Sequence, residues 1–232
     1  MTAHARAAQT IPPAPPPRLL APRGVYAPQY DTDLLLQALD GESVSERSEV
    51  LDLGTGTGAA ALAAARRGAH VTAVDLSWRA VWTARLNARI NRTPIIVRHG
   101  DLGLAWAPGS FDLVVSNPPY VPLPPGTRTA RGEARAWDGG PDGRAVVDRV
   151  CDAAPRALRK GGTLLMVHSA LCDPSRSVRR LEDRGMSAAV IDRAYVPFGP
   201  VLRTRRAWLC AQGLLDADAT YEELVVVRAE LS

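Results

Sequence analysis

Apolar residues recur with two alternating periods from about residue 24 onward. Short apolar runs bounded by turn residues predict buried strands at 49–54, 70–75, 95–101, 111–117, 163–169, 186–196 and 222–230. Longer segments with helical spacing predict helices at 32–40, 58–68, 77–91, 143–162, 173–185 and 200–213. This alternation favours right-handed crossovers and a mainly parallel sheet covered on both faces.

Several residues mark the expected ends of these elements. Ser77 and Asp173 are suitable N-caps, because their side-chain oxygens can accept hydrogen bonds from free helix N–H groups. Pro155 should break the fourth predicted helix and Gly161 should end it. We therefore predict an α/β fold, a Rossmann-like doubly wound sheet of seven strands. It is mostly parallel, with an antiparallel C-terminal edge strand at 222–230.

The N-terminal segment differs in composition from the rest. Residues 1–23 are so rich in proline that they lack the amide donors of a helix or central strand, which predicts a disordered arm. Residues 24–232 have the size of a single domain. The segment "MTAHARAAQT" lacks the layout of a signal peptide, and no apolar run approaches the length of a membrane span. A cytoplasmic protein without membrane association is expected.

Charge and cysteine content exclude little. The formal net charge is +4, but Lys160 is the only lysine, and the abundance of arginine, alanine and proline fits a GC-rich coding preference. The positive charge is therefore weak evidence for nucleic-acid binding. Cys151, Cys172 and Cys210 are odd in number and widely spaced, so they predict neither a disulfide framework nor a metal site.

Three glycines lie within residues 51–58, where the first predicted strand should end and the next helix begin. Gly54, Gly56 and Gly58 permit a tight turn and a close approach of the backbone to a ligand. Asp75 ends the next predicted strand, where a carboxylate can accept hydrogen bonds from both hydroxyls of a ribose. Together, these features predict a bound nucleoside.

Two further carboxylates indicate which nucleoside it is. Asp52 places a negative charge beside the glycine turn, which would repel a pyrophosphate and attract a cationic amino-acid end. Asp101 follows the third predicted strand. There it could accept a hydrogen bond from an adenine amino group, or it could simply form a turn. The glycine spacing also differs from that of dinucleotide sites. S-adenosylmethionine is favoured over NAD.

Asn117 and two prolines follow the fourth strand, at the edge where open α/β sheets bind ligands. An amide or exocyclic nitrogen is a poor nucleophile, because its lone pair is delocalised. The Asn117 side-chain oxygen and the Pro118 carbonyl could accept both of its N–H hydrogens and direct the lone pair at a sulfonium methyl. Tyr120 offers a flat face to a planar substrate group. The alternative is a turn that merely ends the strand.

Motifs in this order resemble those of class I S-adenosylmethionine-dependent methyltransferases that act on amino groups, namely "LDLGTGTG", "AVDLS", "GDL" and "SNPPY". Residues 25–39 and 134–150 are similar to the flanking motifs of HemK2/MTQ2-like protein glutamine methyltransferases. The resemblance covers residues 24–195 and implies N5-methylation of a glutamine, typically in the Gly-Gly-Gln loop of a class I peptide release factor.

The resemblance also implies roles for individual residues. Asp31 and Thr32 would help to close the cofactor site, and Leu76 and Leu102 belong to the second and third cofactor motifs. Tyr30 stands where the family often has glutamate. Related bacterial enzymes carry a helical substrate-docking domain before the cofactor motifs, whereas a proline-rich arm occupies that place here. Some enzymes of this type also need a small zinc-binding activator subunit.

Three other functions remain open on the sequence. The same chemistry could methylate an exocyclic amine in ribosomal RNA or DNA, although the dispersed basic charge makes nucleic acid the less favoured substrate. A non-catalytic cofactor-binding protein would not need the intact Asn-Pro-Pro-Tyr segment. A dehydrogenase is disfavoured by the glycine spacing and by Asp52.

Overall fold

Runs of valine, leucine and alanine form the strands of one sheet, because apolar side chains on both faces of a strand can be buried beneath helices. The computed structural model describes residues 17–102, 107–124 and 137–232. The strands are β1 (Glu49–Leu53), β2 (His70–Asp75), β3 (Ile96–His99), β4 (Phe111–Ser116), β5 (Leu158–Ser169), β6 (Met186–Pro197) and β7 (Tyr221–Leu231). Their order across the sheet is β3-β2-β1-β4-β5-β7-β6.

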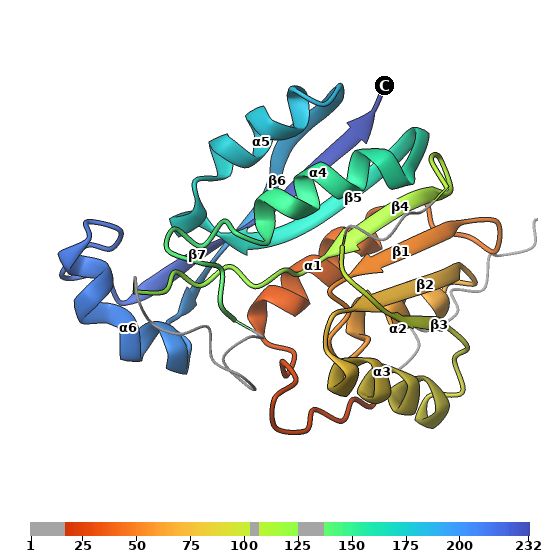
Figure 1. Cartoon of the computed structure of the whole chain (residues 1–232), viewed down its shortest axis with the longest axis horizontal. Coiled ribbons are helices and arrows are strands. Elements are labelled where there is room, and N and C mark those ends of the chain that lie inside the picture. The colour runs from red at the N-terminus through yellow and green to blue at the C-terminus, as the bar shows by residue number, and fades with distance from the viewer. Residues whose placement is uncertain (1–16, 103–106, 125–136) are drawn as a thin grey trace, which may run out of the picture.

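Helices cover both faces of the sheet (Figure 1). They are α1 (Tyr30–Asp40), α2 (Ala59–Ala65), α3 (Trp78–Ile90), α4 (Val147–Ala157), α5 (Pro174–Glu182) and α6 (Pro200–Ala211). The first three pack on one face, whereas α4 and α5 pack together on the other. The last helix, α6, lies at one end of the sheet (Figure 1). The predicted doubly wound α/β architecture is confirmed.

Two predicted N-caps are confirmed. The Ser77 hydroxyl accepts from the backbone N–H three residues later, and Asp173 does the same at the start of α5. α1 begins two residues earlier than predicted, so that Asp31 and Thr32 lie in its first turn. This start brings the side chains of its first turn to the sheet edge where the cavity described below opens.

The boundary between α4 and β5 corrects one prediction. α4 continues through Pro155 and ends at Ala157, and Gly161 lies inside β5 instead of ending the helix. Pro155 is in the last turn, where its missing N–H costs a single hydrogen bond. β5 begins as early as Leu158 because that residue pairs with Phe111 of β4.

The position of the C-terminal strand corrects a second prediction. β7 is antiparallel as predicted, but it pairs with both β5 and β6 and therefore is not an edge strand. Its run Leu224–Val227 is buried, as expected of an internal strand, whereas β6 is largely exposed and forms the edge. The physical reason is that α6 lets the chain turn back and insert its last strand between β5 and β6.

Part of the predicted arm is described. The backbones of Arg18 and Leu20 exchange hydrogen bonds of 2.8–3.0 Å with two side chains, those of Asn91 at the C-cap of α3 and of Asn87 within α3. Residues 1–16 of the arm, and residues 134–136 of the segment after Asn-Pro-Pro-Tyr, lie outside the described residues. None of the described helices is both long and apolar enough to cross a membrane.

Candidate active site

The carboxyl ends of β1 to β4 open into a cavity of about 1780 Å³. A site for one small molecule typically has about 300–1,000 Å³, so this cavity has room for a cofactor and a substrate side chain together. Of the residues predicted from the sequence, the following line it: Asp31, Thr32, Asp52, Gly54, Gly56, Asp75, Leu76, Asp101, Leu102, Asn117, Pro118 and Tyr120. Gly58 does not line it.

The glycine turn has two functions. Gly54 and Gly56 have positive φ angles of 75° and 54°, and a Cβ atom on either would meet no described atom within 4 Å. Because both residues also line the cavity, an added side chain would project toward the ligand space. Gly58 instead faces α3, where an added Cβ would lie 3.3 Å from the Cβ of Ala84. Gly58 is therefore a packing residue.

Asp52 supports the turn from within. Its Oδ2 accepts hydrogen bonds from the Thr55 hydroxyl at 2.6 Å and from the Ala61 N–H at 3.2 Å. Burial raises the pKa of Asp52 to about 6, and these two hydrogen bonds partly offset that rise. The carboxyl group thus links β1, the glycine turn and the first turn of α2.

Asp75 ends β2 and Asp101 follows β3, as predicted. The Asp75 carboxylate accepts from the backbone N–H groups of Gly56 and Ser77, at 3.0 and 2.8 Å, which fixes it beside the glycine turn. Asp101 is half exposed and forms an ion pair with Arg149 of α4. Asp75 is therefore held rigidly, whereas Asp101 lies in a more solvated part of the cavity wall.

Apolar and aromatic groups complete this side of the cavity. Leu76 is partly exposed and Leu102 is buried, and both contribute to the wall. The Trp78 ring stacks on His99 with centroids 4.0 Å apart, and the His99 ring lies 2.9 Å from the Leu76 carbonyl oxygen. The turn after β2 is thereby fixed against the end of β3.

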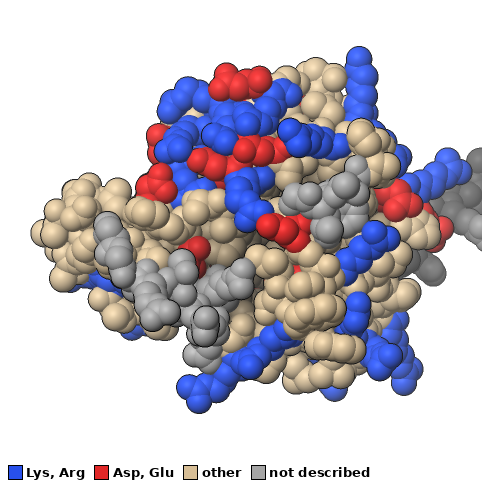
Figure 2. All heavy atoms as spheres, in the orientation of Figure 1, with Lys and Arg blue, Asp and Glu red and all other residues tan. Residues whose placement is uncertain are grey.

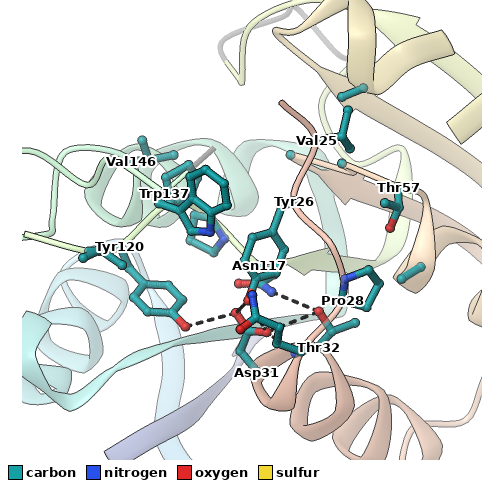
Figure 3. A pocket seen from close by; sticks show the side chains of 18 of the residues that line it. Val25, Tyr26, Pro28, Asp31, Thr32, Thr57, Asn117, Tyr120, Trp137 and Val146 are labelled. Carbon is teal, nitrogen blue, oxygen red and sulfur yellow. Dashed lines mark hydrogen bonds between the residues drawn. The ribbon is translucent and has the colours of Figure 1, made fainter. Parts of the chain in front are cut away.

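Asn117 lies where β4 ends, directly across from α1 (Figure 3). Its Nδ2 is 3.5 Å from the Thr32 hydroxyl and donates to it, so the amide nitrogen is directed toward α1. Asn117 and Pro118 both line the cavity. The preceding Ser116 donates to the Leu53 carbonyl at 2.8 Å, which fixes the end of β4 against β1.

Asp31 is the most highly coordinated carboxylate of the site (Figure 3). It is 3% exposed, and it accepts from the hydroxyls of Tyr26 at 2.7–2.8 Å and of Tyr120 at 3.0 Å. The backbone N–H of Thr32 donates to it as well, at 2.6 Å. Burial and the Asp31 charge raise the pKa of both tyrosines, so both remain protonated donors.

The loop that contains Trp137 and Gly139 supports the segment that follows β4. The backbone of Val121 is paired with Trp137 and Gly139 through two 3.0 Å hydrogen bonds. Arg205 of α6 donates to the Pro122 carbonyl at 2.8 Å and forms an ion pair with Asp138 at 2.7 Å. Residues from three distant parts of the chain therefore fix the backbone that carries Tyr120.

Glu222, near the start of β7, was not predicted from the sequence. It is 7% exposed and lines the cavity. Burial, with a smaller contribution from the Asp31 charge, raises the pKa of Glu222 to about 7, although a hydrogen bond with Ser169 opposes the rise. The sequence signal for this residue is weak, because an acidic residue just before an apolar strand is usually exposed to solvent.

Tyr26 and Arg205 were also not predicted. Tyr26 lies in the segment that resembles the family motif, but its hydrogen bond to Asp31 depends on how the chain enters α1. Arg205 occurs in a run of arginines that indicates a solvated helix face, whereas the structure buries much of its side chain. No local pattern separates it from its neighbours Arg203 and Arg206.

Comparison with known proteins agrees with this geometry. Residues 18–125 match the methyltransferase small domain family. A Methanocaldococcus jannaschii protein assigned as a protein N5-glutamine methyltransferase is 34% identical over 175 residues, which cover 75% of this chain and 87% of that protein. The methyltransferase HEMK2 of Mus musculus is 35% identical over 173 residues, 71% of this chain and 80% of HEMK2.

A longer relative and a solved structure extend the comparison. The release factor glutamine methyltransferase of Mycolicibacterium smegmatis is 39% identical over 168 residues, which cover 68% of this chain and 58% of that enzyme. A chain of the E. cuniculi Mtq2–Trm112 complex, which methylates the translation termination factor eRF1, superposes with a TM-score of 0.63 at 27% identity. That match covers 90% of this chain and 99% of the other. The chain therefore belongs to the HemK2/MTQ2-like family of protein glutamine methyltransferases.

Proposed function

We propose that this protein transfers a methyl group from S-adenosylmethionine to the N5 nitrogen of a glutamine in a peptide release factor. The observation that carries the proposal is the placement of Asn117. Its Nδ2 donates to Thr32 and the residue lines the cavity, so its oxygen would be available on the cavity side. With the adjacent Pro118 carbonyl, that oxygen can accept the two N–H hydrogens of a primary amide.

The described residues fit the cofactor. Gly54 and Gly56 leave open the space that a Cβ would fill, so a ligand can approach their backbone. Asp75 would hold the ribose hydroxyls, and Asp101 the adenine amino group, with Leu76 and Leu102 packing beside the base. Asp31 and Thr32 would close the site from α1. The bound cofactor supplies an activated methyl group on a sulfonium.

The residues of this chain then act on the amide. Asn117 and Pro118 would hold the NH₂ group with its lone pair directed at the methyl group, which reduces the delocalisation that makes an amide a poor nucleophile. Tyr120 would pack against the planar amide, and Asp31 fixes its hydroxyl at 3.0 Å. The nitrogen can lose its proton after transfer, so a strong general base is not required.

A protein substrate is favoured over nucleic acid by the relatives and by the surface. Basic side chains over α4 and α5 are interleaved with acidic ones (Figure 2). Arg176 and Arg180 form ion pairs with Asp148 and Asp152 at 2.9 and 2.7 Å. Such paired charges do not make the continuous basic face that phosphate backbones require.

Labelled methyl transfer tests the proposal. The purified protein is incubated with labelled S-adenosylmethionine and either a release factor or ribosomal RNA, and mass spectrometry identifies the modified group. We expect label on a glutamine amide of the release factor. Asn117→Ala should lower kcat by about 10²- to 10³-fold, whereas Asn91→Ala, outside the cavity, should not. Label in RNA alone would contradict the proposal.

A small activator subunit is a second part of the proposal. Trp82, Leu86 and Ile90 form a stripe on α3 that is 43–62% exposed, and Ile96 on the adjacent edge strand β3 is 58% exposed. Exposed apolar groups gathered beside an open strand edge are typical of a protein interface. The Mtq2–Trm112 complex provides a precedent for a partner. We propose that a Trm112-like subunit covers this surface.

A further inference from the structure

Glu222 occupies an unusual position for an acidic side chain. β7 is antiparallel, so its first residues lie at the edge where the parallel strands end. The Glu222 side chain is 7% exposed and lines the cavity there. Its Oε1 has no hydrogen-bond partner among the described residues. A buried carboxylate oxygen without a donor is costly, which indicates that a ligand supplies one.

Neighbouring groups do not supply that donor. Tyr26 and Tyr120 both direct their hydroxyls at Asp31. Ser169 hydrogen-bonds to Glu222, but Oε1 remains unpaired. Asp138 also lines the cavity and has one unpaired oxygen, but its charge is balanced by Arg205. Glu222 has no such cation within ion-pair distance in the part of the chain that the structure describes.

The strand order places Glu222 on the side of the cavity away from Asp75 and the glycine turn. Asp75 and the glycine turn belong to β2 and β1, whereas β7 lies two strands beyond β4 in the opposite direction. Two strand spacings are about 10 Å. That distance from the end of β4 corresponds to about three residues of extended chain. A peptide whose glutamine reaches Asn117 could therefore also pass Glu222.

We propose that Glu222 is a positioning residue that accepts a hydrogen bond from a main-chain N–H of the substrate loop beside the methylated glutamine. The inference rests on the function proposed above. Main-chain N–H groups are donors that every peptide loop carries, and an ionised acceptor binds them more strongly than a neutral one does. The contact would fix the loop so that its glutamine enters between Asn117 and Tyr120.

Two variants and a matched control test the inference. Glu222→Ala removes the acceptor, and Glu222→Gln keeps a neutral oxygen of the same reach. Glu223→Gln is the control, because Glu223 is adjacent on β7 and does not line the cavity. Its carboxylate instead pairs with Arg193 at 2.6 Å. The measurements are kcat and KM for the release factor, Kd for S-adenosylmethionine, and Tm.

We expect KM for the release factor to rise about tenfold or more in Glu222→Ala, because a hydrogen bond to a charged group contributes that much. Glu222→Gln should lie between Glu222→Ala and wild type, and Glu223→Gln should match wild type. Kd for S-adenosylmethionine should change less than twofold in each. A purely structural role would instead lower Tm and weaken both ligands together.

The pH dependence adds a readout that a structural role would not give. Wild-type kcat/KM should fall as the pH drops through about 7, where Glu222 becomes protonated, and Glu222→Gln should lack this fall. The titratable groups facing Glu222 are Asp31, Tyr26, Tyr120 and Cys172. Unchanged KM in Glu222→Ala, with an active wild type, overturns the inference. An inactive wild type overturns the proposed function instead.

Discussion

At the scale of single residues, Asp31 connects the two parts of the site. It accepts hydrogen bonds from Tyr26, which precedes α1, and from Tyr120, which follows β4. A buried carboxylate is tolerated here because four donor groups, which include the backbone N–H and the hydroxyl of Thr32, compensate for its lost hydration. The position of the substrate-side tyrosine therefore depends on the same helix that carries Thr32, the partner of Asn117.

Tyr120→Phe tests this connection. The variant removes one donor from Asp31 but leaves the ring, so we expect a stability loss of about 1 kcal/mol. The kcat for methyl transfer should fall roughly tenfold, because the segment beside Asn117 loses its link to α1. Urea unfolding and steady-state kinetics measure the two effects. Tyr195→Phe, whose side chain is 72% exposed, is the control and should change neither.

Glu222 predicts a pH dependence of stability. Its pKa in the folded state is about 7, above its ordinary value of 4.5, so folding retains a proton that the unfolded chain releases. Stability is therefore lost as the pH rises from about 4.5 to 7. Glu222→Gln should therefore stabilise the protein more at pH 8 than at pH 5. The gain in the free energy of unfolding over wild type should be roughly 1–3 kcal/mol larger at pH 8. Urea unfolding at both pH values measures this; an equal effect at both would contradict it.

At the scale of elements, the loop 137–145 supports the segment after β4 through close packing. A Cβ on Gly143 would lie 2.4 Å from the Tyr120 carbonyl oxygen and 2.6 Å from Cys172 Sγ. Both distances are shorter than atoms tolerate, so the backbone of Tyr120 would have to move. Gly143 also has a φ of +76°, which is a strained angle for any other residue.

Gly143→Ala should therefore lower kcat by about tenfold to a hundredfold, and it should lower Tm as well. Gly185→Ala is a matched control, because Gly185 has a φ of +79° and an added Cβ would meet no described atom within 4 Å. The positive φ angle should destabilise the folded state of both variants by about 1 kcal/mol, but only Gly143→Ala displaces Tyr120. Equal loss of activity in the two would show that the contact is unimportant.

The strands, the caps and the glycine turn could be predicted because their signals are local. The apolar run of β4 and the Ser77 cap are read from a few adjacent residues. The insertion of β7 between β5 and β6 depends on pairing between distant segments, which no local pattern specifies. Likewise, Glu222 reaches the cavity because β7 is antiparallel there, so its place follows from topology.

At the scale of the whole molecule, the two edges of the sheet differ in what they expose. At the β3 edge, the apolar stripe of α3 lies beside an open strand, and Ile96 is exposed there. At the β6 edge, the exposed residues include Ile191 and Tyr195, but Arg193 and Glu223 form an ion pair nearby. An isolated apolar group among charges needs no partner, whereas a continuous apolar surface does.

This difference makes the activator proposal testable. Leu86→Lys combined with Ile96→Lys would place two charges in the proposed interface, which should weaken binding of the Trm112-like protein of the same organism tenfold or more. Neither residue lines the cavity, so basal methyl transfer without the subunit should be unchanged. Calorimetry measures binding, and methyl labelling with and without the subunit measures stimulation.

The opposite edge provides the control for this experiment. Ile191→Lys introduces the same charge at a residue that is 48% exposed on β6, so it should leave both binding and stimulation intact. If Ile191→Lys abolishes stimulation and the α3–β3 variant does not, the partner docks at the other end of the sheet. If the wild-type protein neither binds the subunit nor gains activity from it, the apolar surface has another occupant.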